Sequence, residues 1–299
     1  MAEGRNAPAT ALADEPPAME QQERSQNLRD LAMDAASSKT FIAGAAILLF
    51  WILMALFWGA VVPYGPQALD PTASLAPPSA EHWFGTDNLG RDVFSRVLAG
   101  ASSVLTVAPL GTALGMLGGI AVGLVTGYYR GRVDDVVMRV VDALLAFPLI
   151  IIAVLVLSVL GPSKVNVILV IGVVFTPIVA RTVRSAVLSE REREYVAAAR
   201  LRGESGLYIM VSEILPNILS PIAVEATIRL GYAIFTSATL SFLSLGIQEP
   251  SPDWGLTISI GRVYLQAAPW MVLFPALALA TLVVAVNLVA DGLLQAVED

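Results

Sequence analysis

Long runs of uncharged residues set the pattern of this chain. Five stretches carry no charged side chain, at residues 41–69, 97–129, 143–163, 165–180 and 263–290. A sixth window, at residues 214–248, is long enough for a span but contains Glu225 and Arg229. A helix needs about 20 mostly apolar residues to cross the hydrocarbon core of a bilayer. The pattern predicts an all-α integral membrane protein with about six transmembrane helices, at about residues 41–62, 102–128, 142–161, 164–181, 215–242 and 268–290.

Composition supports this prediction. Hydrophobic residues make up 56% of the chain and charged residues only 14%, whereas about 25% of a soluble domain is charged. A lipid bilayer is therefore the expected surroundings of the protein. The net charge of -7 argues against nucleic acid as a partner, and the absence of cysteine excludes disulfides and thiolate metal sites. We expect no cofactor and no metal.

The basic residues predict the orientation. Most Lys and Arg side chains fall in segments that are cytoplasmic if the N-terminus is cytoplasmic. Cytoplasmic loops carry an excess of Lys and Arg, so both termini are expected in the cytoplasm. Residues 1–38 are polar and contain no apolar run, which predicts a cytoplasmic tail in front of a transmembrane domain at residues 39–299.

The segment at residues 190–213 is the least membrane-like part of the chain after the N-terminal tail. It is rich in Arg and Glu, yet it carries apolar residues at helical spacing. Gly203 is expected to divide it into two short helices, because glycine readily takes the left-handed conformation that ends a helix. Two interpretations stay open on this pattern. The pair is either a docking element for another protein or a pair of helices lying on lipid headgroups.

Catalytic chemistry is missing from the chain. A phosphate-binding loop needs a lysine after glycine, and the two lysines, Lys39 and Lys164, both follow serine. Any ATP hydrolysis must therefore come from another polypeptide, and we expect no catalytic residue here. The single histidine, His82, stands beside Trp83 and is expected to make a loop contact or to pack on an aromatic ring.

Charged residues inside a predicted span are costly, so they normally face protein or water. Glu225 and Arg229 are four residues apart with the acid first, which favours an intrahelical ion pair. They either line a translocation path or neutralise each other against a partner helix. Gly115, Gly119 and Gly123 share one helix face, which permits close approach of a second helix.

The cytoplasmic segment resembles the EAA loop of ABC importer permeases. The residues that carry this resemblance are Glu194, Tyr195, Ala198, Ala199, Arg200, Gly203, Leu215 and Pro216. In that family the loop inserts into a cleft of the ATPase subunit and transmits its closure to the membrane helices. The resemblance implies a type I ABC importer permease fold with a cytoplasmic coupling loop at about residues 190–213.

Further motifs resemble the second, or C-type, permeases of dipeptide, oligopeptide and nickel importers. One is an outer-loop signature that contains Gly85, Thr86, Asp87, Gly90, Arg91 and Asp92. Others are found at residues 146–148, at residues 240–255 and near the C-terminus. Together they cover the chain from about residue 40 to its end.

The resemblance implies a permease subunit in the bacterial cytoplasmic (inner) membrane. Its expected partners are a second homologous permease, two cytoplasmic ATPase subunits and an extracytoplasmic substrate-binding protein, with the passage between the two permeases. Peptides are the expected substrates, although permeases for glutathione, nickel, opines and some saccharides share these motifs. Two other functions remain to be tested: an ion-coupled secondary carrier that uses Glu225 and Arg229, and a membrane scaffold that transports nothing.

Overall fold

The computed structural model describes residues 38–298. The predicted polar tail, residues 1–38, lies outside this range except for Ser38. Residues 38–298 form helices and loops without a strand, apart from an isolated β-bridge between Thr86 and Asp92. The predicted all-α class is therefore confirmed for the part of the chain that the structure describes.

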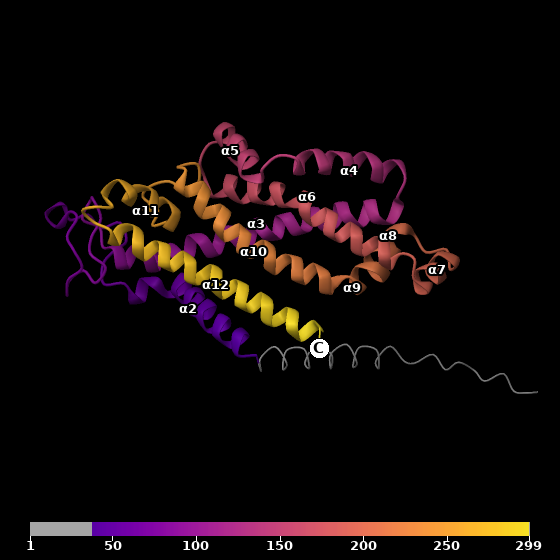
Figure 1. Cartoon of the computed structure of the whole chain (residues 1–299), viewed down its shortest axis with the longest axis horizontal. Helices are drawn as coiled ribbons and strands as arrows, with labels where there is room; N and C mark the ends of the chain where they lie inside the picture. The colour runs from indigo at the N-terminus through magenta and orange to yellow at the C-terminus, as the bar shows by residue number, and fades with distance from the viewer. Residues whose placement is uncertain (1–37, 299) are drawn as a thin grey trace, which may run out of the picture.

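Most of the helices run along one common axis (Figure 1). Their bounds are α2 (Lys39–Val61), α3 (Val93–Tyr129), α4 (Arg132–Leu145), α5 (Leu149–Leu160), α6 (Lys164–Glu190), α7 (Glu194–Leu201), α8 (Gly206–Tyr208), α9 (Leu215–Asn217), α10 (Leu219–Phe242), α11 (Trp254–Gly261) and α12 (Trp270–Glu298). Short 3-10 turns lie at Pro71–Ala73 and Arg262–Tyr264, and a π-helical turn spans Ile209–Ile214.

Four helices are long and apolar enough to cross a membrane: α2, α3, α6 and the Trp270–Gly292 part of α12. Two bent pairs, α4 with α5 and α8–α9 with α10, raise the number of crossings in the described residues to six if each pair is one span. The prediction of about six spans agrees with this upper count.

The predicted span at residues 142–161 is not one straight helix. Helix α4 ends at Leu145, α5 begins at Leu149, and the two axes are bent by 88°. Pro148 causes the break, because proline lacks a backbone N–H and keeps the residue before it out of helical geometry. Helix α5 has 12 residues, or about 18 Å, which is too short to cross a bilayer without α4.

A continuous seam joins residues 111–127 of α3 to residues 171–187 of α6. Every fourth residue of α3 in the seam is glycine, and each faces a larger side chain of α6. The pairs are Gly111 with Ile171, Gly115 with Phe175, Gly119 with Val179, Gly123 with Val183, and Gly127 with Val187. A Cβ atom at any of these glycines would lie within 3 Å of the α6 side chain. The predicted close approach at Gly115, Gly119 and Gly123 is confirmed, and α6 is the helix that uses it.

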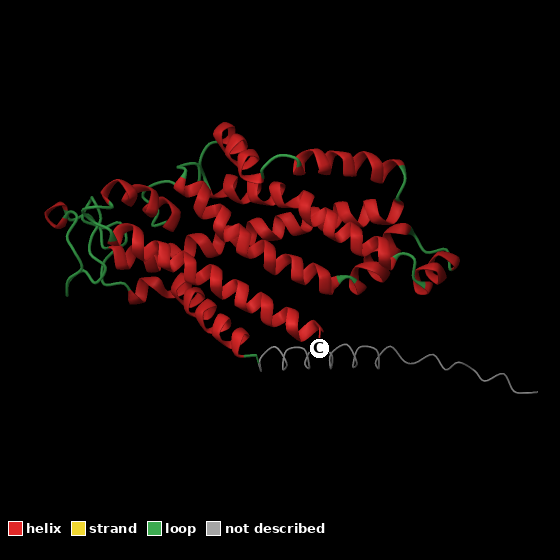
Figure 2. Cartoon of the chain, in the orientation of Figure 1, coloured by secondary structure: helices red, strands yellow, loops and turns green. Residues whose placement is uncertain are grey.

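The loops of the structure gather at the two ends of the long axis (Figure 2). One end, here called the loop end, carries residues 62–92 and 243–269, including α11. The opposite end, the coupling end, carries α7 and α8. Trp254 fastens α11 to the bundle, since its indole Nε1 donates a hydrogen bond to the carbonyl of Val97 at 2.8 Å and its ring meets Trp51 edge-on. The predicted coupling loop at one end and the predicted outer-loop signature at the other are thus far apart in the structure.

Candidate functional site

The coupling segment, residues 190–213, begins with a well-formed short helix. Helix α7 ends at Leu201 and is closed by Gly203, whose φ angle is +79°. The N–H of Gly203 donates to the carbonyl of Arg200, and the N–H of Glu204 donates to that of Ala199. These two bonds form the helix-ending arrangement that glycine favours. The predicted break at Gly203 is confirmed.

The chain after Gly203 returns to the membrane helices through an irregular path. Helix α8 leads into the π-helical turn Ile209–Ile214, which is followed by Leu215 and Pro216 in α9. Helix α10 then continues at an angle of 71° to this segment. Pro216 contributes to the irregularity because it cannot donate the backbone hydrogen bond of a regular helix. Two changes of direction thus separate α7 from α10.

One face of α7 is buried against the bundle. Val196 and Ala199 are fully buried and belong to an apolar cluster with Val187 of α6 and Ile209 and Ile214 of the π turn. Any displacement of α7 must therefore move α6 and the start of α10 or break this cluster.

Polar contacts hold the same helix. The hydroxyl of Tyr195 donates to Oε1 of Glu190 at 2.9 Å and accepts a hydrogen bond from Nδ2 of Asn217 at 3.2 Å. Burial, together with the hydrogen bond to Glu190, raises the pKa of Tyr195 to about 12. The tyrosine therefore links the end of α6 to α9 in its neutral form.

The coupling segment also touches the end of α3. The guanidinium of Arg200 lies over the ring of Tyr128, 5.3 Å from its centroid. Arg191 donates to the backbone carbonyl of Tyr128 at 2.6 Å. Burial, and then the nearby charges of Arg130 and Arg200, lower the pKa of Arg191. The segment is thus joined to α3, α6 and α10 together.

The opposite face of the coupling segment is exposed and partly apolar. Leu201 is 90% exposed and Leu207 is 68% exposed. Glu194 and Ala198 are exposed on α7 as well. Two exposed leucines among charged residues fit both interpretations of this segment, a docking element for another protein and a pair of helices on lipid headgroups.

Glu225 and Arg229 form the predicted ion pair within α10. Nε of Arg229 donates to Oε1 of Glu225 at 2.7 Å, and Glu225 is 7% exposed. Thr182 of α6 donates to the other carboxylate oxygen at 3.4 Å. The guanidinium also lies over the rings of Tyr232 and Phe175, at 5.1 and 6.0 Å. The pair is mutually neutralised and faces α6.

The signature loop, residues 84–92, is a compact turn at the loop end. Gly85 and Gly90 have φ angles of +71° and +73°. A Cβ atom at Gly90 would overlap the carbonyl oxygen of Asp70, and one at Gly85 would lie 2.7 Å from the indole of Trp270. Both positions need glycine for space and for backbone conformation. Trp270 also donates from Nε1 to the carbonyl of Thr86 at 2.9 Å, which fixes the loop on α12.

Asp87 and Arg91 of the signature are buried and paired. Oδ1 of Asp87 accepts the N–H groups of Leu89 and Arg91, and Oδ2 accepts Nε of Arg91 at 2.6 Å. The other nitrogens of Arg91 donate to the carboxylate of Glu249. Burial alone would lower the pKa of Arg91, but its bonds to Glu249 and Asp87 raise it. This ion pair ties the signature loop to the loop that precedes α11.

Arg96 completes this cluster and was missed by the sequence analysis. It is 1% exposed, and its guanidinium donates to the carbonyls of Pro66 and Ser251 at 3.1 and 3.2 Å. Glu249 was missed as well. The sequence did contain a signal for this role, because Arg96 and Glu249 each stand next to motif residues at the edge of an apolar stretch.

Asp92 closes the signature loop and starts α3. Its Oδ2 accepts the N–H of Ser95 at 2.7 Å, as an N-cap does, and its Oδ1 lies 2.9 Å from Nδ1 of His82. The imidazole packs on the ring of Tyr64 at 4.8 Å between centroids. The predicted role of His82 as a loop contact with aromatic packing is confirmed.

Comparisons with known proteins agree with this geometry. The sequence profile of the family described as binding-protein-dependent transport system inner membrane component matches residues 119–299. The chain is 39% identical over 283 residues to a dipeptide transport system permease protein DppC of Alkalihalophilus pseudofirmus, covering 95% of this chain and 93% of that one. It is 36% identical to a di/tripeptide transport system permease protein DppC of Pseudomonas aeruginosa, covering 91% of each chain.

The fold is similar to that of a solved transporter. A chain of the MetNI methionine ABC transporter, in a structure of its inward-facing conformations, superposes with a TM-score of 0.57 at 21% identity. The match covers 68% of this chain and 96% of that one. Neither the carrier nor the scaffold hypothesis is favoured by these similarities. The chain belongs to the binding-protein-dependent transport system inner membrane components and is a membrane-spanning permease subunit of an ABC importer.

Proposed function

We propose that this chain forms half of the translocation pathway of an ATP-driven importer for peptides or similar small solutes. Its partners are a second homologous permease, two cytoplasmic ATPase subunits that hydrolyse the ATP, and an extracytoplasmic substrate-binding protein. The peptide substrate is supported by the relatives named for dipeptides and tripeptides. The two lysines of this chain lie outside any phosphate-binding motif, so the nucleotide is bound elsewhere.

The coupling segment carries this proposal. It presents an exposed face with Leu201 and Leu207 at one end of the molecule, while its other face is buried against the membrane helices. The exposed face is where the ATPase subunit docks, with Glu194, Ala198 and Arg200 around it. The coupling end then faces the cytoplasm and the loop end faces outward, in the bacterial cytoplasmic membrane, with both termini inside.

Motion passes from the docking face to the helices through the buried contacts. When the ATPase subunits close, they displace α7, and the cluster around Val196 and Ala199 moves α6 with it. The π turn and the bend before α10 allow that helix to change its angle without breaking. Rigid-body switching of this kind needs two packed arrangements of the helices rather than continuous bending.

Glu225 and Arg229 are the proposed polar groups on the translocation path. Charged side chains within a span normally face protein or a water-filled cavity, and this pair satisfies its own charge in α10. Because the chain has no cysteine, Arg229→Cys gives a single reactive thiol. If water-soluble thiol reagents label this cysteine at no stage of the transport cycle, the pair does not line the path.

Gly203 offers the sharpest test of the coupling assignment. Its φ of +79° is unfavourable for a β-branched residue, and nothing lies within 4 Å of an added Cβ atom. Gly203→Val therefore strains the backbone without a clash, by about 1–2 kcal/mol. The matched control is Gly203→Asn, because asparagine tolerates this conformation. We expect Gly203→Val to lower peptide uptake by roughly tenfold in reconstituted complexes and Gly203→Asn to stay close to wild type.

Full uptake together with full ATPase association in the Gly203→Val complex would contradict the coupling assignment. Reconstitution of this chain alone tests the carrier hypothesis: uptake driven by a proton gradient, without ATPase or partner permease, would support the carrier. Normal transport by a complex that lacks this chain would support the scaffold.

A further inference from the structure

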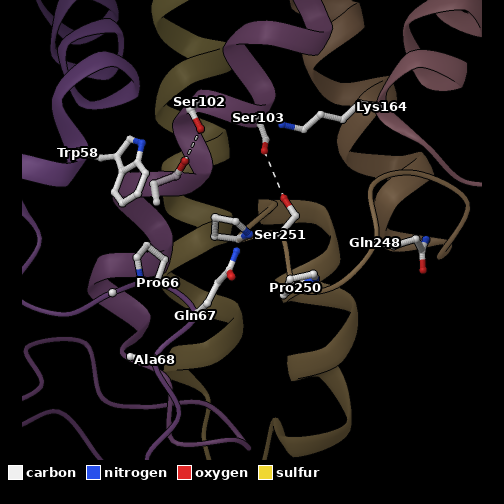
Figure 3. Close-up of a pocket in the computed structure, with 13 residues that line it drawn as sticks. Trp58, Pro66, Gln67, Ala68, Ser102, Ser103, Lys164, Gln248, Pro250 and Ser251 are labelled. Carbon is white, nitrogen blue, oxygen red and sulfur yellow. Dashed lines mark hydrogen bonds between the residues drawn. The ribbon is translucent and has the colours of Figure 1, made fainter.

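A cavity of about 640 Å³ opens at the loop end (Figure 3). Its walls come from α2, α3, the first residue of α6, and two loops at residues 65–68 and 248–252. Pockets for small ligands commonly enclose about 300–1,000 Å³. The cavity is therefore large enough for a molecule of dipeptide or tripeptide size. The coupling segment and the Glu225–Arg229 pair contribute nothing to it.

Lys164 is the one charged residue among those that line the cavity. It is the first residue of α6, and in Figure 3 its amino group extends toward Ser103. In residues 38–298 it takes part in no ion pair, although most arginines of the loop end do. Lys164 is exposed, so its ammonium is open to solvent at the cavity and can be reached by an anionic ligand.

Two carboxylates lie near the cavity without lining it. Glu249 binds Arg91. Asp253 is fully buried, and its Oδ1 accepts the N–H of Leu256 at 3.0 Å as the N-cap of α11, whereas its Oδ2 has no hydrogen-bond partner. Burial raises the pKa of Asp253, and the positive charge of Lys164 opposes that rise. No acidic side chain lines the cavity to neutralise Lys164.

The rest of the lining supplies hydrogen-bonding groups on an apolar wall. Ser103 and Ser251 approach each other at 3.4 Å between hydroxyl oxygens, a weak contact that leaves both able to bind a ligand. Gln67 also lines the cavity, and its carboxamide has the same donor and acceptor groups as a peptide bond. Trp58 adds an aromatic surface. A cation, hydroxyls, a carboxamide and an aromatic ring together suit a short peptide with a free carboxylate.

We propose that this cavity is a receiving subsite in which Lys164 binds the C-terminal carboxylate of the transported peptide at the outer mouth of the permease. The inference rests on the proposed function for its orientation and its substrate class. It adds a residue, Lys164, and a chemical requirement, a free carboxylate. A phospholipid phosphate is also an anion, so the experiment must separate the two.

The two lysines of the chain make a direct experiment possible. The assembled importer, in nanodiscs of neutral phosphatidylcholine, is treated with an amine-acetylating reagent, and mass spectrometry gives the acetylation rate of each lysine. Lys39, the exposed first residue of α2, is the internal control in the same molecule. The probes are alanyl-alanine and alanyl-alanine amide, which differ in the free carboxylate. Each is used at about 20 mM, enough to fill a site with a Kd of about 1 mM.

We expect alanyl-alanine to slow acetylation of Lys164 by roughly tenfold or more, as expected for a site that is mostly filled. Because the amino groups of both probes also consume the reagent, each rate is read as the ratio of Lys164 to Lys39 acetylation, and the amide should leave this ratio unchanged. Equal acetylation of Lys164 with and without alanyl-alanine overturns the proposal. The proposal is also overturned if Lys164 is never acetylated in the assembled importer, because a partner subunit would then cover the cavity. Protection that instead follows the addition of anionic phosphatidylglycerol, with no effect of peptide, identifies a lipid site and also overturns it.

Transport measurements separate this inference from the proposed function. Lys164→Gln should raise the concentration of alanyl-alanine at half-maximal uptake by about tenfold, the effect of losing one hydrogen bond to a charged group. Lys39→Gln should leave it unchanged. If the wild-type complex imports no peptide, the proposed substrate is wrong, and the acetylation result still decides whether Lys164 binds a carboxylate. If the wild type imports alanyl-alanine and Lys164→Gln imports it equally well, only the subsite fails.

Discussion

The glycine seam between α3 and α6 predicts a large effect from one methyl group. A Cβ atom added at Gly119 would lie 2.4 Å from both Cβ and Cγ1 of Val179 and 2.9 Å from the backbone nitrogen of Ala180. Carbon atoms are comfortable at about 3.5–4.0 Å, so Gly119→Ala must push the two helices apart by more than about 1 Å. Val179 is fully buried and has no free space to move into.

Two opposing contributions determine how much Gly119→Ala changes the free energy of unfolding. Overpacking of a tight core costs about 1–3 kcal/mol, whereas replacing glycine by alanine within a helix gains about 1 kcal/mol of intrinsic helix preference. We therefore expect Gly119→Ala to lower the free energy of unfolding by up to about 2 kcal/mol. Gly59 in α2 is the matched control, because nothing lies within 4 Å of an added Cβ atom there. Gly59→Ala should keep the gain in helix preference and raise the free energy of unfolding by up to about 1 kcal/mol.

The assay is unfolding of the purified chain in mixed micelles with increasing SDS, followed by loss of helical circular dichroism. The difference between the two alanine variants isolates the contact at the seam, since both have the same gain in helix preference. If Gly119→Ala and Gly59→Ala unfold at the same SDS fraction, α3 and α6 are not packed as closely as described, and the reasoning from the seam is refuted.

Two further predictions concern the ends of the molecule. Arg91→Met removes the hydrogen-bonded cation of Asp87 and Glu249 and leaves only Arg96, at 3.8 Å from each carboxylate, so it should lower the free energy of unfolding by roughly 3 kcal/mol in the SDS assay. The exposed Arg130→Met should have little effect in the same assay. Tyr195→Phe removes the hydroxyl that donates to Glu190 and should destabilise the coupling segment by about 1 kcal/mol, measured as faster proteolysis there. The pKa of Tyr195 is raised from 10.0 to about 12 in the folded protein, so the stability that its hydroxyl contributes is fully present below about pH 10 and is lost as the pH rises toward 12. Tyr195→Phe should not show this alkaline loss of stability. If the variant does show it, the tyrosine is not its cause.

A structural feature could be predicted from the sequence where the residue type or its spacing has one usual structural role. The break at Gly203 could be predicted because glycine is the residue that ends a helix in the left-handed conformation. The Glu225–Arg229 pair could be predicted because residues four apart lie on the same helix face. Hydropathy gave the approximate positions of the long helices, since the thickness of a bilayer fixes the length of an apolar run.

Tertiary contacts were the part that could not be predicted. Pro148 marks a break, but the 88° between α4 and α5 depends on packing and is absent from the local pattern. Arg96 and Glu249 are 153 residues apart by their numbering, and hydropathy cannot show that they share one cluster with Asp87. In the sequence Lys164 is only the first residue of a predicted span, and the cavity next to it is formed by loops that are distant in sequence.

The seam also makes α3 and α6 one mechanical unit. Helix α3 has 37 residues, so the pair is a rod about 55 Å long that reaches from the signature loop at one end to the coupling segment at the other. Rotation of such a rod by about 10° around its midpoint displaces each end by roughly 5 Å, in opposite directions. A push on the inner side would therefore open or close the outer side at the same moment, without any signal passing through intermediate side chains. Leverage of this kind would couple the two ends of the molecule in the proposed transport cycle.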